Sequence, residues 1–234
     1  MWLRGEVQYD DTTSDGWYDT IGDEYYSIEA LQSAEVDRDM EVLLADTRND
    51  KKLAALVAKC KEASAALGLT EDMTDRKDKE SVETKRNVVK MIAGLVADAM
   101  GGSVSYEDYN DWGYAAEIKR CKELRRSNVV WIGDMRRGVC RHRAFLFKFL
   151  CDQVMAGLAR VERAKTGKGA HVGHAWNEVK FYGDNDADGQ QIIYTLDLMH
   201  DIGKLFNNGT DLIPPDEWVA KYTHKDVYHF LALQ

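Results

Sequence analysis

Cys140, His174 and Asp197 are the residues of this sequence whose types and order could support nucleophilic catalysis. A thiol becomes an effective nucleophile when a base takes its proton, and a third group commonly orients that base. Cysteine, then histidine, then acid is the chain order of a large class of thiol enzymes. Such a set attacks an amide or ester carbonyl through a thioester. The sequence therefore predicts a thiol hydrolase or acyltransferase with Cys140 as the nucleophile.

The sequence around Cys140, RRGVCRHRAFLFKFL from Arg136 to Leu150, favours the thiolate form. A glycine-containing turn leads directly into a helix, and Cys140 falls in the first turn of that helix. Backbone N–H groups at a helix start and nearby cations both lower the pKa of a thiol. We therefore expect an activated cysteine within a basic band of four arginines: Arg136, Arg137, Arg141 and Arg143.

The segments that carry His174 and Asp197 have a different period from the one that carries Cys140. Apolar residues recur at helical spacing from Cys140 to Leu158, whereas residues 174–182 and 191–199 alternate as strands do. The polar GDNDADG stretch between them predicts a hairpin with a long loop. Facing side chains of adjacent antiparallel strands lie about 5 Å apart, so a suitable strand register would place His174 and Asp197 side by side. A helix start packed on this hairpin would aim the Cys140 sulfur at the imidazole.

The rest of the chain predicts helices ahead of this sheet, which is an α+β pattern in a single domain over residues 1–234. Helical spacing covers residues 51–67, 88–100 and 114–126, with a short helix at 216–222 after Pro214-Pro215. Strands are expected at 2–9, 40–48, 128–132 and 227–233, and a short extended piece follows the turn near residue 16. Residues 77–86 and 160–170 are charged and predict loops.

Composition is typical of a folded intracellular protein. Of the 234 residues, 44% are apolar and 30% are charged. The sequence has no signal pattern and no apolar run of about 20 residues, so neither export nor a membrane span is expected. The four cysteines lack CxxC spacing, which predicts reduced thiols in the cytoplasm. Cys121 and Cys151 lie on apolar helical stripes and are expected to be structural.

The net charge of −9 is unevenly distributed. Residues 119–143 hold nine lysines and arginines against two acids, while the remainder is strongly acidic. An acidic body argues against nucleic-acid binding, which usually requires a basic domain. The basic stretch predicts an acidic protein substrate or partner near Cys140. The alternative is an ordinary solvated helix face.

The sequence HDIGK at 200–204 suggests a different function, because it matches the metal-binding signature of HD-type phosphohydrolases. With the other C-terminal histidines it would supply enough imidazoles for a metal site. That family is helical, however, and here the pair follows an alternating strand. We therefore predict no metal and no cofactor. His200 and Asp201 are expected to shape the turn, with His200 near the cleft.

Three blocks, GVCRHRAFLFKFL, HAWNEVKF and YTLDLMHD, resemble those of the transglutaminase-like and papain-like superfamily. Their form is similar to the peptidase-like domain at the front of plant Raf-like kinases of the ethylene-response and disease-resistance type. That domain also occurs at the end of certain armadillo-repeat proteins. The segments WLRGEVQYDDTTSDGWYDTIGD and VLLADTRNDKKLAAL resemble its opening, so the resemblance covers about residues 2–206, with 207–234 as a C-terminal extension.

The resemblance implies a papain/transglutaminase-like fold in which the nucleophile helix packs on an antiparallel sheet. It makes Cys140 the nucleophile, His174 the base and Asp197 the orienting acid. In papain-like members an upstream side chain, usually Gln, helps to bind the oxyanion. This sequence has no obvious Gln there, which leaves Asn128 and Trp131 as the candidates.

Two functions remain open. In the first, the chain is a thiol enzyme. In the second, it is a catalytically silent protein-binding module of a larger signalling or armadillo-repeat assembly. Trp176, close to His174, is expected in the core, with the wall of a substrate groove as the alternative. No kinase glycine loop or catalytic motif occurs in these 234 residues. Further domains are therefore expected outside this chain.

Overall fold

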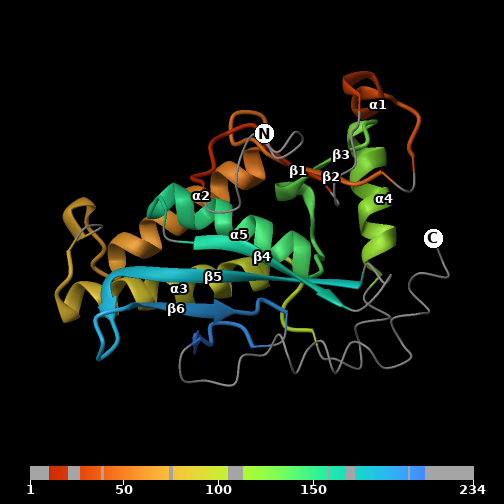
Figure 1. Ribbon diagram of the computed structural model, residues 1–234. Helices are drawn as coiled ribbons and strands as arrows, with labels where there is room; N and C mark the ends of the chain where they lie inside the picture. The colour runs from red at the N-terminus through yellow and green to blue at the C-terminus, as the bar shows by residue number, and fades with distance from the viewer. Residues whose placement is uncertain are drawn as a thin grey trace.

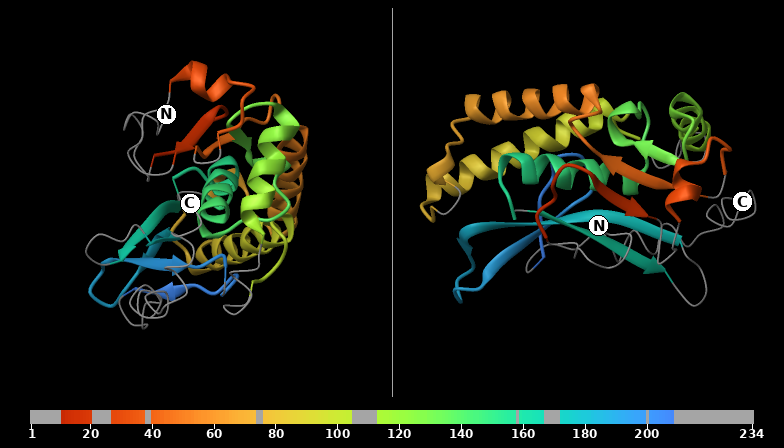
Figure 2. Two further views of the ribbon diagram at one scale, coloured as in Figure 1. Left: turned by 90° about the vertical axis from the view of Figure 1, so that its right-hand side faces the viewer. Right: turned by 90° about the horizontal axis from the view of Figure 1, so that it is seen from above.

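The computed structural model of the chain describes residues 11–20, 27–37, 40–73, 76–104, 113–157, 159–166, 172–199 and 201–208. Helices and two small sheets form an α+β fold, as predicted. Helix α5 (Cys140–Val154) lies at the centre, with the larger sheet on one side and helices α2 (Lys51–Ala66) and α3 (Lys79–Ala99) on the other (Figures 1 and 2). The elements expected at 2–9, 216–222 and 227–233 lie outside the described residues.

Helix α5 is buried on nearly every side rather than along one stripe. Twelve of its 15 residues are buried, including Arg143 and Lys148, because both a sheet and two helices pack against it. Phe145 adds a ring contact with Trp17, at 6.0 Å between centroids. The helix ends at Val154, four residues before the predicted end at Leu158. None of the helices in the described part of the chain is long and apolar enough to cross a membrane.

The larger sheet has four antiparallel strands in the order β4-β5-β6-β7: Ala159–Thr166, Val172–Asn185, Gln191–Leu196 and Phe206–Asn207. The predicted hairpin is confirmed as β5 and β6. The predicted loop over 160–170 is wrong, because residues 159–166 form strand β4. This strand lies at the edge of the sheet, where a charged sequence is compatible with pairing on one side only.

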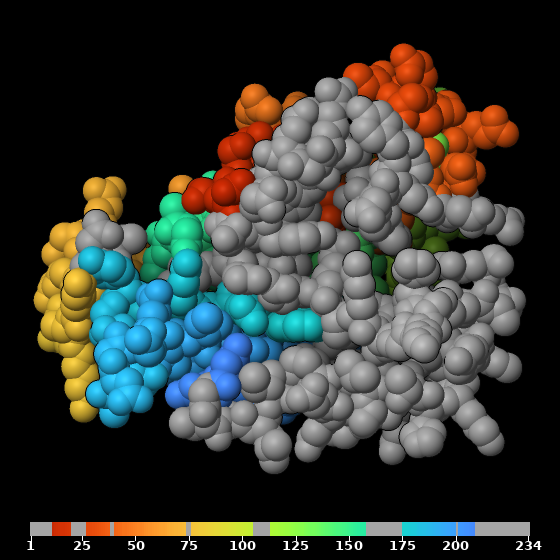
Figure 3. All heavy atoms as spheres, viewed as in Figure 1, coloured from red at the N-terminus to blue at the C-terminus, as the bar shows by residue number. Residues whose placement is uncertain are grey.

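Alternate residues of β5 face the helices. Ala175, Asn177, Val179 and Phe181 are all buried, as expected for one face of a strand covered by a helix layer. At the far end of the hairpin, Arg86 of α3 donates to the Asp184 carboxylate at 2.5 Å. Figure 3 shows α3 and this end of the hairpin side by side on the surface. The hairpin is therefore held both along α5 and at its tip.

The smaller sheet joins segments that are far apart in the sequence. Strand β2 (Val42–Ala45) pairs antiparallel with β1 (Trp17–Thr20) and parallel with β3 (Val129–Trp131). Each strand matches a predicted extended segment, but the parallel pairing was not predicted. A parallel pair needs a long crossover. Here α2, α3 and α4 (Tyr114–Arg125) lie between β2 and β3 in the sequence.

Helices α2 and α3 start at aspartate caps, Asp50 and Asp78. Helix α3 begins at Lys79, earlier than predicted, because Asp78 accepts the Ser81 N–H at 3.0 Å. The predicted loop over 77–86 is therefore wrong for most of its length. Short elements complete the chain: α1 (Ile28–Gln32) and 3₁₀ turns at Glu71–Met73 and Ile132–Asp134.

Asp50 connects α2 to the turn at Ile132–Asp134. One carboxylate oxygen accepts the N–H groups of Lys52 and Leu53, and the other accepts the Gly133 N–H at 2.9 Å. A Cβ at Gly133 would lie 2.5 Å from this carboxylate, so glycine is required for the close approach. Asp50 is itself buried.

Asp50→Ala is expected to lower the free energy of unfolding by about 2 to 3 kcal/mol, because a cap is lost and the Gly133 N–H loses its partner. Urea unfolding measures this change. Ser27→Ala, which removes the exposed cap of the short helix α1, is the control and should cost clearly less. Equal effects in the two variants would contradict the connecting role of Asp50.

Candidate active site

Cys140 is the first residue of α5, where the sequence predicted it. Val139 precedes the helix in an extended conformation, and the helix begins with the bond from the Arg143 N–H to the Val139 carbonyl, at 3.1 Å. The turn before it is anchored by Gly138, whose N–H donates to the Met100 carbonyl at 3.3 Å. A Cβ at Gly138 would lie 2.5 Å from the Met100 sulfur. Glycine thus allows the turn to approach the end of α3.

The surroundings of Cys140 bring the predicted blocks together. The thiol residue is 6% exposed and packs in a small apolar cluster with Val104, Ala144, Ala175 and Met199. Ala175 directly follows His174 on β5, and Met199 comes two residues after Asp197. The start of the nucleophile helix therefore packs on the hairpin segments that carry the predicted base and acid.

His174 and Asp197 lie at the same end of the β5–β6 hairpin. Asn177 pairs with Leu196, so Asp197 follows this pair immediately and His174 precedes it by three residues. Asp197 is fully buried, and its Oδ1 accepts the Met199 N–H at 2.7 Å. For His174 the structure describes the backbone alone, opposite Ala164 on β4. Contact among the three side chains remains a prediction.

Arg143 has a different role from the one predicted. Its guanidinium is fully buried and donates to the carbonyl oxygens of Gly138 (2.7 Å), Leu198 (2.8 Å) and Met100 (2.9 Å). Burial lowers the pKa of Arg143 to about 10, against the opposing effects of Asp197 and Cys140. It therefore stays cationic at neutral pH. Arg143 joins the turn before Cys140 to the residue that follows Asp197.

The predicted basic band does not form a continuous positive surface. Arg141 is paired with Asp19, at 3.2 Å, and with Glu41. Elsewhere in the basic stretch, Arg120 is paired with Glu117 and Arg125 with Asp134. The acids on Arg141 come from β1 and from just before β2, which a count along the sequence could not reveal. Exposed arginines remain in the turn before the nucleophile, at Arg136 and Arg137.

Asn128, a predicted oxyanion donor, is engaged elsewhere. Its amide nitrogen donates to the carbonyls of Ala30 (3.0 Å) and Glu35 (3.1 Å), and its oxygen accepts the Asp37 N–H at 2.8 Å. These bonds hold α1 and the segment that follows it against the start of β3. The structure thus gives Asn128 a structural role.

The structure describes two of the three other candidates for the cleft, Trp131 and Trp176. Trp131 ends β3 beneath the guanidinium of Arg125, at 4.2 Å from the ring centroid. Trp176 is buried, in agreement with the alternative that placed it in the core. His200 lies outside the described residues, as do His171, His224 and His229.

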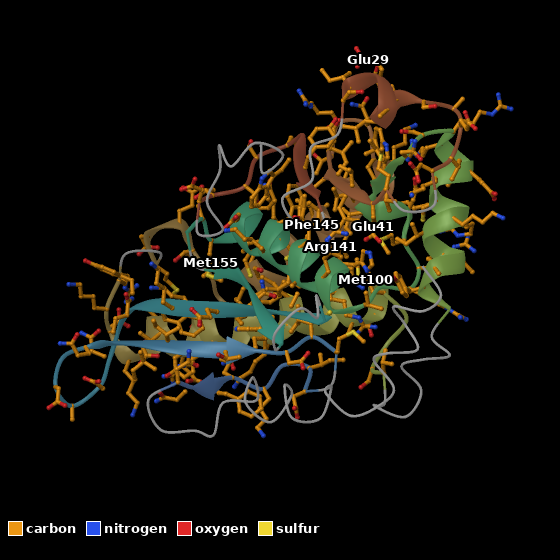
Figure 4. The ribbon with its side chains drawn as sticks, turned by 45° about the vertical axis from the view of Figure 1, so that its right-hand side comes forward. Glu29, Glu41, Met100, Arg141, Phe145 and Met155 are labelled. Atoms are coloured by element: carbon orange, nitrogen blue, oxygen red, sulfur yellow. The ribbon has the colours of Figure 1, made fainter. Side chains whose placement is uncertain are left out.

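An anion–imidazole pair beside Cys140 was not predicted. His142 Nε2 lies 2.7 Å from Glu41 Oε1, and His142 Nδ1 accepts the Val139 N–H at 3.1 Å. The ring of Tyr114 lies 6.1 Å from that of His142. Figure 4 shows Glu41 and Arg141 side by side near the start of α5. A histidine two residues after the candidate nucleophile was visible in the sequence, but its acid was not.

Glu41 is held as a carboxylate. Burial acts to raise its pKa, but Arg141 and His142 outweigh burial and lower the pKa to about 2. The charge of this buried group is therefore balanced on both sides, by a guanidinium and by an imidazole N–H.

The remaining cysteines are buried and unreactive by their surroundings. Burial raises the pKa of Cys60 and of Cys121 to about 11, and it also raises the pKa of Cys151 well above the usual value of a thiol. Their burial agrees with the structural role predicted for Cys121 and Cys151. Cys140 is the candidate nucleophile on position alone, since it stands at a helix start.

No metal site is seen in the described residues. No group of three potential ligands is close enough to hold an ion in that part of the chain. The segment before HDIGK is the β5–β6 hairpin, as predicted, and not the helix of HD-type phosphohydrolases. An open cavity of about 300 Å³ lies between α2, α3 and the turn at Ile132–Asp134, lined among others by Lys52, Lys59, Met100, Met135 and Leu146.

Arg143→Met is expected to lower the free energy of unfolding by about 3 kcal/mol or more, because three buried carbonyls lose their donor. Thermal or urea unfolding measures the loss. Arg136→Met, at an exposed arginine of the same stretch, is the matched control and should stay within about 0.5 kcal/mol of the parent protein. A similar effect of both substitutions would refute the joining role of Arg143.

The low pKa of Glu41 predicts a component of acid stability. A depressed carboxyl pKa contributes stability above the unfolded value of 4.5, and this contribution is lost as pH falls toward about 2. The shift corresponds to roughly 3 kcal/mol. Glu41→Gln should therefore destabilise the protein at pH 7, and its difference from the parent should shrink between pH 4.5 and 2. A difference that is constant with pH, measured by urea unfolding, would contradict this assignment.

The chain matches one family model and is similar in sequence to several known proteins. A model of the family described as EDR1/CTR1/ARMC3, peptidase-like, matches residues 1–206. The chain is 34% identical over 97 residues to Armadillo repeat-containing protein 3 of Homo sapiens, covering 42% of the chain and 10% of that protein. It is 30% identical over 170 residues to Serine/threonine-protein kinase CTR1 of Arabidopsis thaliana, covering 65% of the chain and 19% of that protein.

A third relative, Probable serine/threonine-protein kinase SIS8 of Arabidopsis thaliana, is 28% identical over 213 residues, covering 87% of the chain and 19% of that protein. The matched segments therefore span a fifth or less of these curated relatives. No solved structure matches the chain significantly.

Proposed function

Because the chain belongs to the EDR1/CTR1/ARMC3 peptidase-like family, we propose that it is a regulatory peptidase-like domain whose Cys140, His174 and Asp197 form a thiol triad. In this proposal the fold is of the papain/transglutaminase type. One observation supports it above all: Cys140 at the start of α5 shares one apolar cluster with Ala175 and Met199, which lie one and two residues after His174 and Asp197.

The triad would act by forming and resolving a thioester. His174 takes the proton of the Cys140 thiol, and the sulfur attacks an amide or ester carbonyl. Asp197 orients His174 and stabilises its charged form. The tetrahedral oxyanion is met by N–H groups at the start of α5, which have no acceptor within the helix. His174 protonates the leaving group, which departs and leaves the acyl group as a thioester on Cys140. Attack by water on this thioester gives hydrolysis, and attack by an amine gives acyl transfer.

A catalytically silent binding module is the second candidate. It is supported by the enclosure of Cys140, which is 6% exposed within an apolar cluster. The relatives named as kinases and as an armadillo-repeat protein contain the matched region as a minor part of their length. We infer that further domains accompany this one. The exposed Arg136 and Arg137 near Cys140 support an acidic protein as the partner or substrate. The proposal includes no nucleic acid, and it places the protein in a reducing cytoplasm.

The rate of Cys140 alkylation as a function of pH separates the two candidates. We expect iodoacetamide to modify Cys140 with a thiol pKa below the free value of about 8.5, and His174→Ala to remove this low-pH reactivity. Mass spectrometry of each cysteine peptide gives the site-specific rates, with buried Cys121 as the internal reference.

Two acid variants control this experiment. Asp197→Asn should slow alkylation at neutral pH, whereas Asp201→Asn, four residues further along the same segment, should not. If Cys140 reacts no faster than Cys121 in the parent protein, the enzyme proposal fails and the silent binding module is retained.

A further inference from the structure

We propose that Glu41 and His142 are positioning residues for Cys140: Glu41 fixes the tautomer of His142, and His142 fixes the backbone N–H directly before the thiol residue. The contact itself follows from the geometry of the described residues. Its consequence for reactivity rests on the function proposed above.

The hydrogen bonds of His142 define its tautomer. Nδ1 accepts the Val139 N–H at 3.1 Å, so this nitrogen carries no proton. Nε2 then carries the proton and donates it toward Glu41 Oε1, at 2.7 Å. A carboxylate opposite Nε2 favours this arrangement over the Nδ1–H tautomer. The ring is 1% exposed, so no solvent exchange of partners is expected.

The start of α5 needs this arrangement because its cap residue cannot provide a cap. Val139 has no side-chain oxygen to accept an N–H of the first turn. The bond from the Val139 N–H to the His142 side chain is the reverse half of a capping box. Val139 is buried, so without His142 its N–H would have neither a protein acceptor nor water to bind. The first turn, and with it Cys140, depends on the ring of His142.

Glu41 connects this turn to a separate part of the fold. It directly precedes β2 of the smaller sheet and binds both Arg141 and His142 of α5. Arg141 in turn binds Asp19 of β1 through the carboxylate at 3.2 Å and the carbonyl at 3.1 Å. Strand β1 and the residue just before β2 therefore hold the start of α5 through two acids, of which Glu41 reaches His142.

Asp19 is a natural control for Glu41. Both acids are buried and both pair with Arg141, so removal of either takes one carboxylate from the same guanidinium. The hydrogen bond to His142 Nε2 is made by Glu41 Oε1. Glu41→Met removes the acceptor facing His142, Glu41→Gln keeps an acceptor oxygen, and Asp19→Ala leaves the imidazole pair intact.

The first measurement is the His142 tautomer in the full chain, by long-range ¹H–¹⁵N correlation. We expect the Nε2–H form in the parent protein and in Asp19→Ala, and its loss in Glu41→Met. The Val139 amide proton should be protected from exchange in the first two proteins and exposed in the third. An Nδ1–H form in the parent protein would overturn the proposal. This readout stands even if Cys140 proves unreactive.

The second measurement is the rate of Cys140 alkylation in the same variants. Displacement of the first turn in Glu41→Met should slow the reaction about tenfold, in line with the sensitivity of reacting groups to small misplacement. Glu41→Gln should recover most of the rate, and Asp19→Ala should stay within about twofold of the parent. Cys140 should be alkylated faster in His142→Asn, which keeps an acceptor near the Nδ1 position, than in His142→Ala. Equal losses in Glu41→Met and Asp19→Ala would overturn the positioning role.

Discussion

A guanidinium buried among main-chain carbonyls is the interaction on which the candidate site depends. Arg143 spans from the end of α3 to the turn before Cys140 and to the residue after Asp197. A buried charge is tolerated only where hydrogen bonds replace its hydration. The three carbonyls provide these hydrogen bonds, so burial of Arg143 requires the three segments that carry them to lie together. The segments around Cys140 and Asp197 are thus joined by the hydrogen bonds of Arg143.

The same principle recurs along α5. Lys148, also fully buried, pairs with Asp152 at 3.0 Å, and the carboxylate further accepts the N–H and hydroxyl of Thr13. Polar groups on this helix therefore bind the segments that surround it, while its phenylalanines fill the core. A helix buried on all sides needs such internal partners, since water reaches few of its side chains.

Two sheets meet the helix in different ways. The four-stranded sheet packs along it through alternate apolar residues of β5, whereas the smaller sheet reaches its first turn through Glu41 and Asp19. The arrangement explains why the basic stretch is not a free cationic surface. Arg141, next to Cys140, is matched by acids brought in from the N-terminal strands, and Arg136 and Arg137 in the turn are exposed. The proposed acidic partner would meet this exposed part.

The sequence by itself determined the α+β class, the helix that begins at Cys140 and the hairpin that carries His174 and Asp197, because periodicity and turn chemistry are local properties. It also determined the family, through the three blocks around those residues. It missed β4, the early start of α3 and the structural engagement of Asn128. Which charges are paired, which arginine is buried and which acid faces His142 were decided by tertiary structure. The acids on Arg141 and His142 lie 100 to 122 residues away in the sequence, and two of the carbonyls on Arg143 lie 43 and 55 residues away, so no local pattern encodes these contacts.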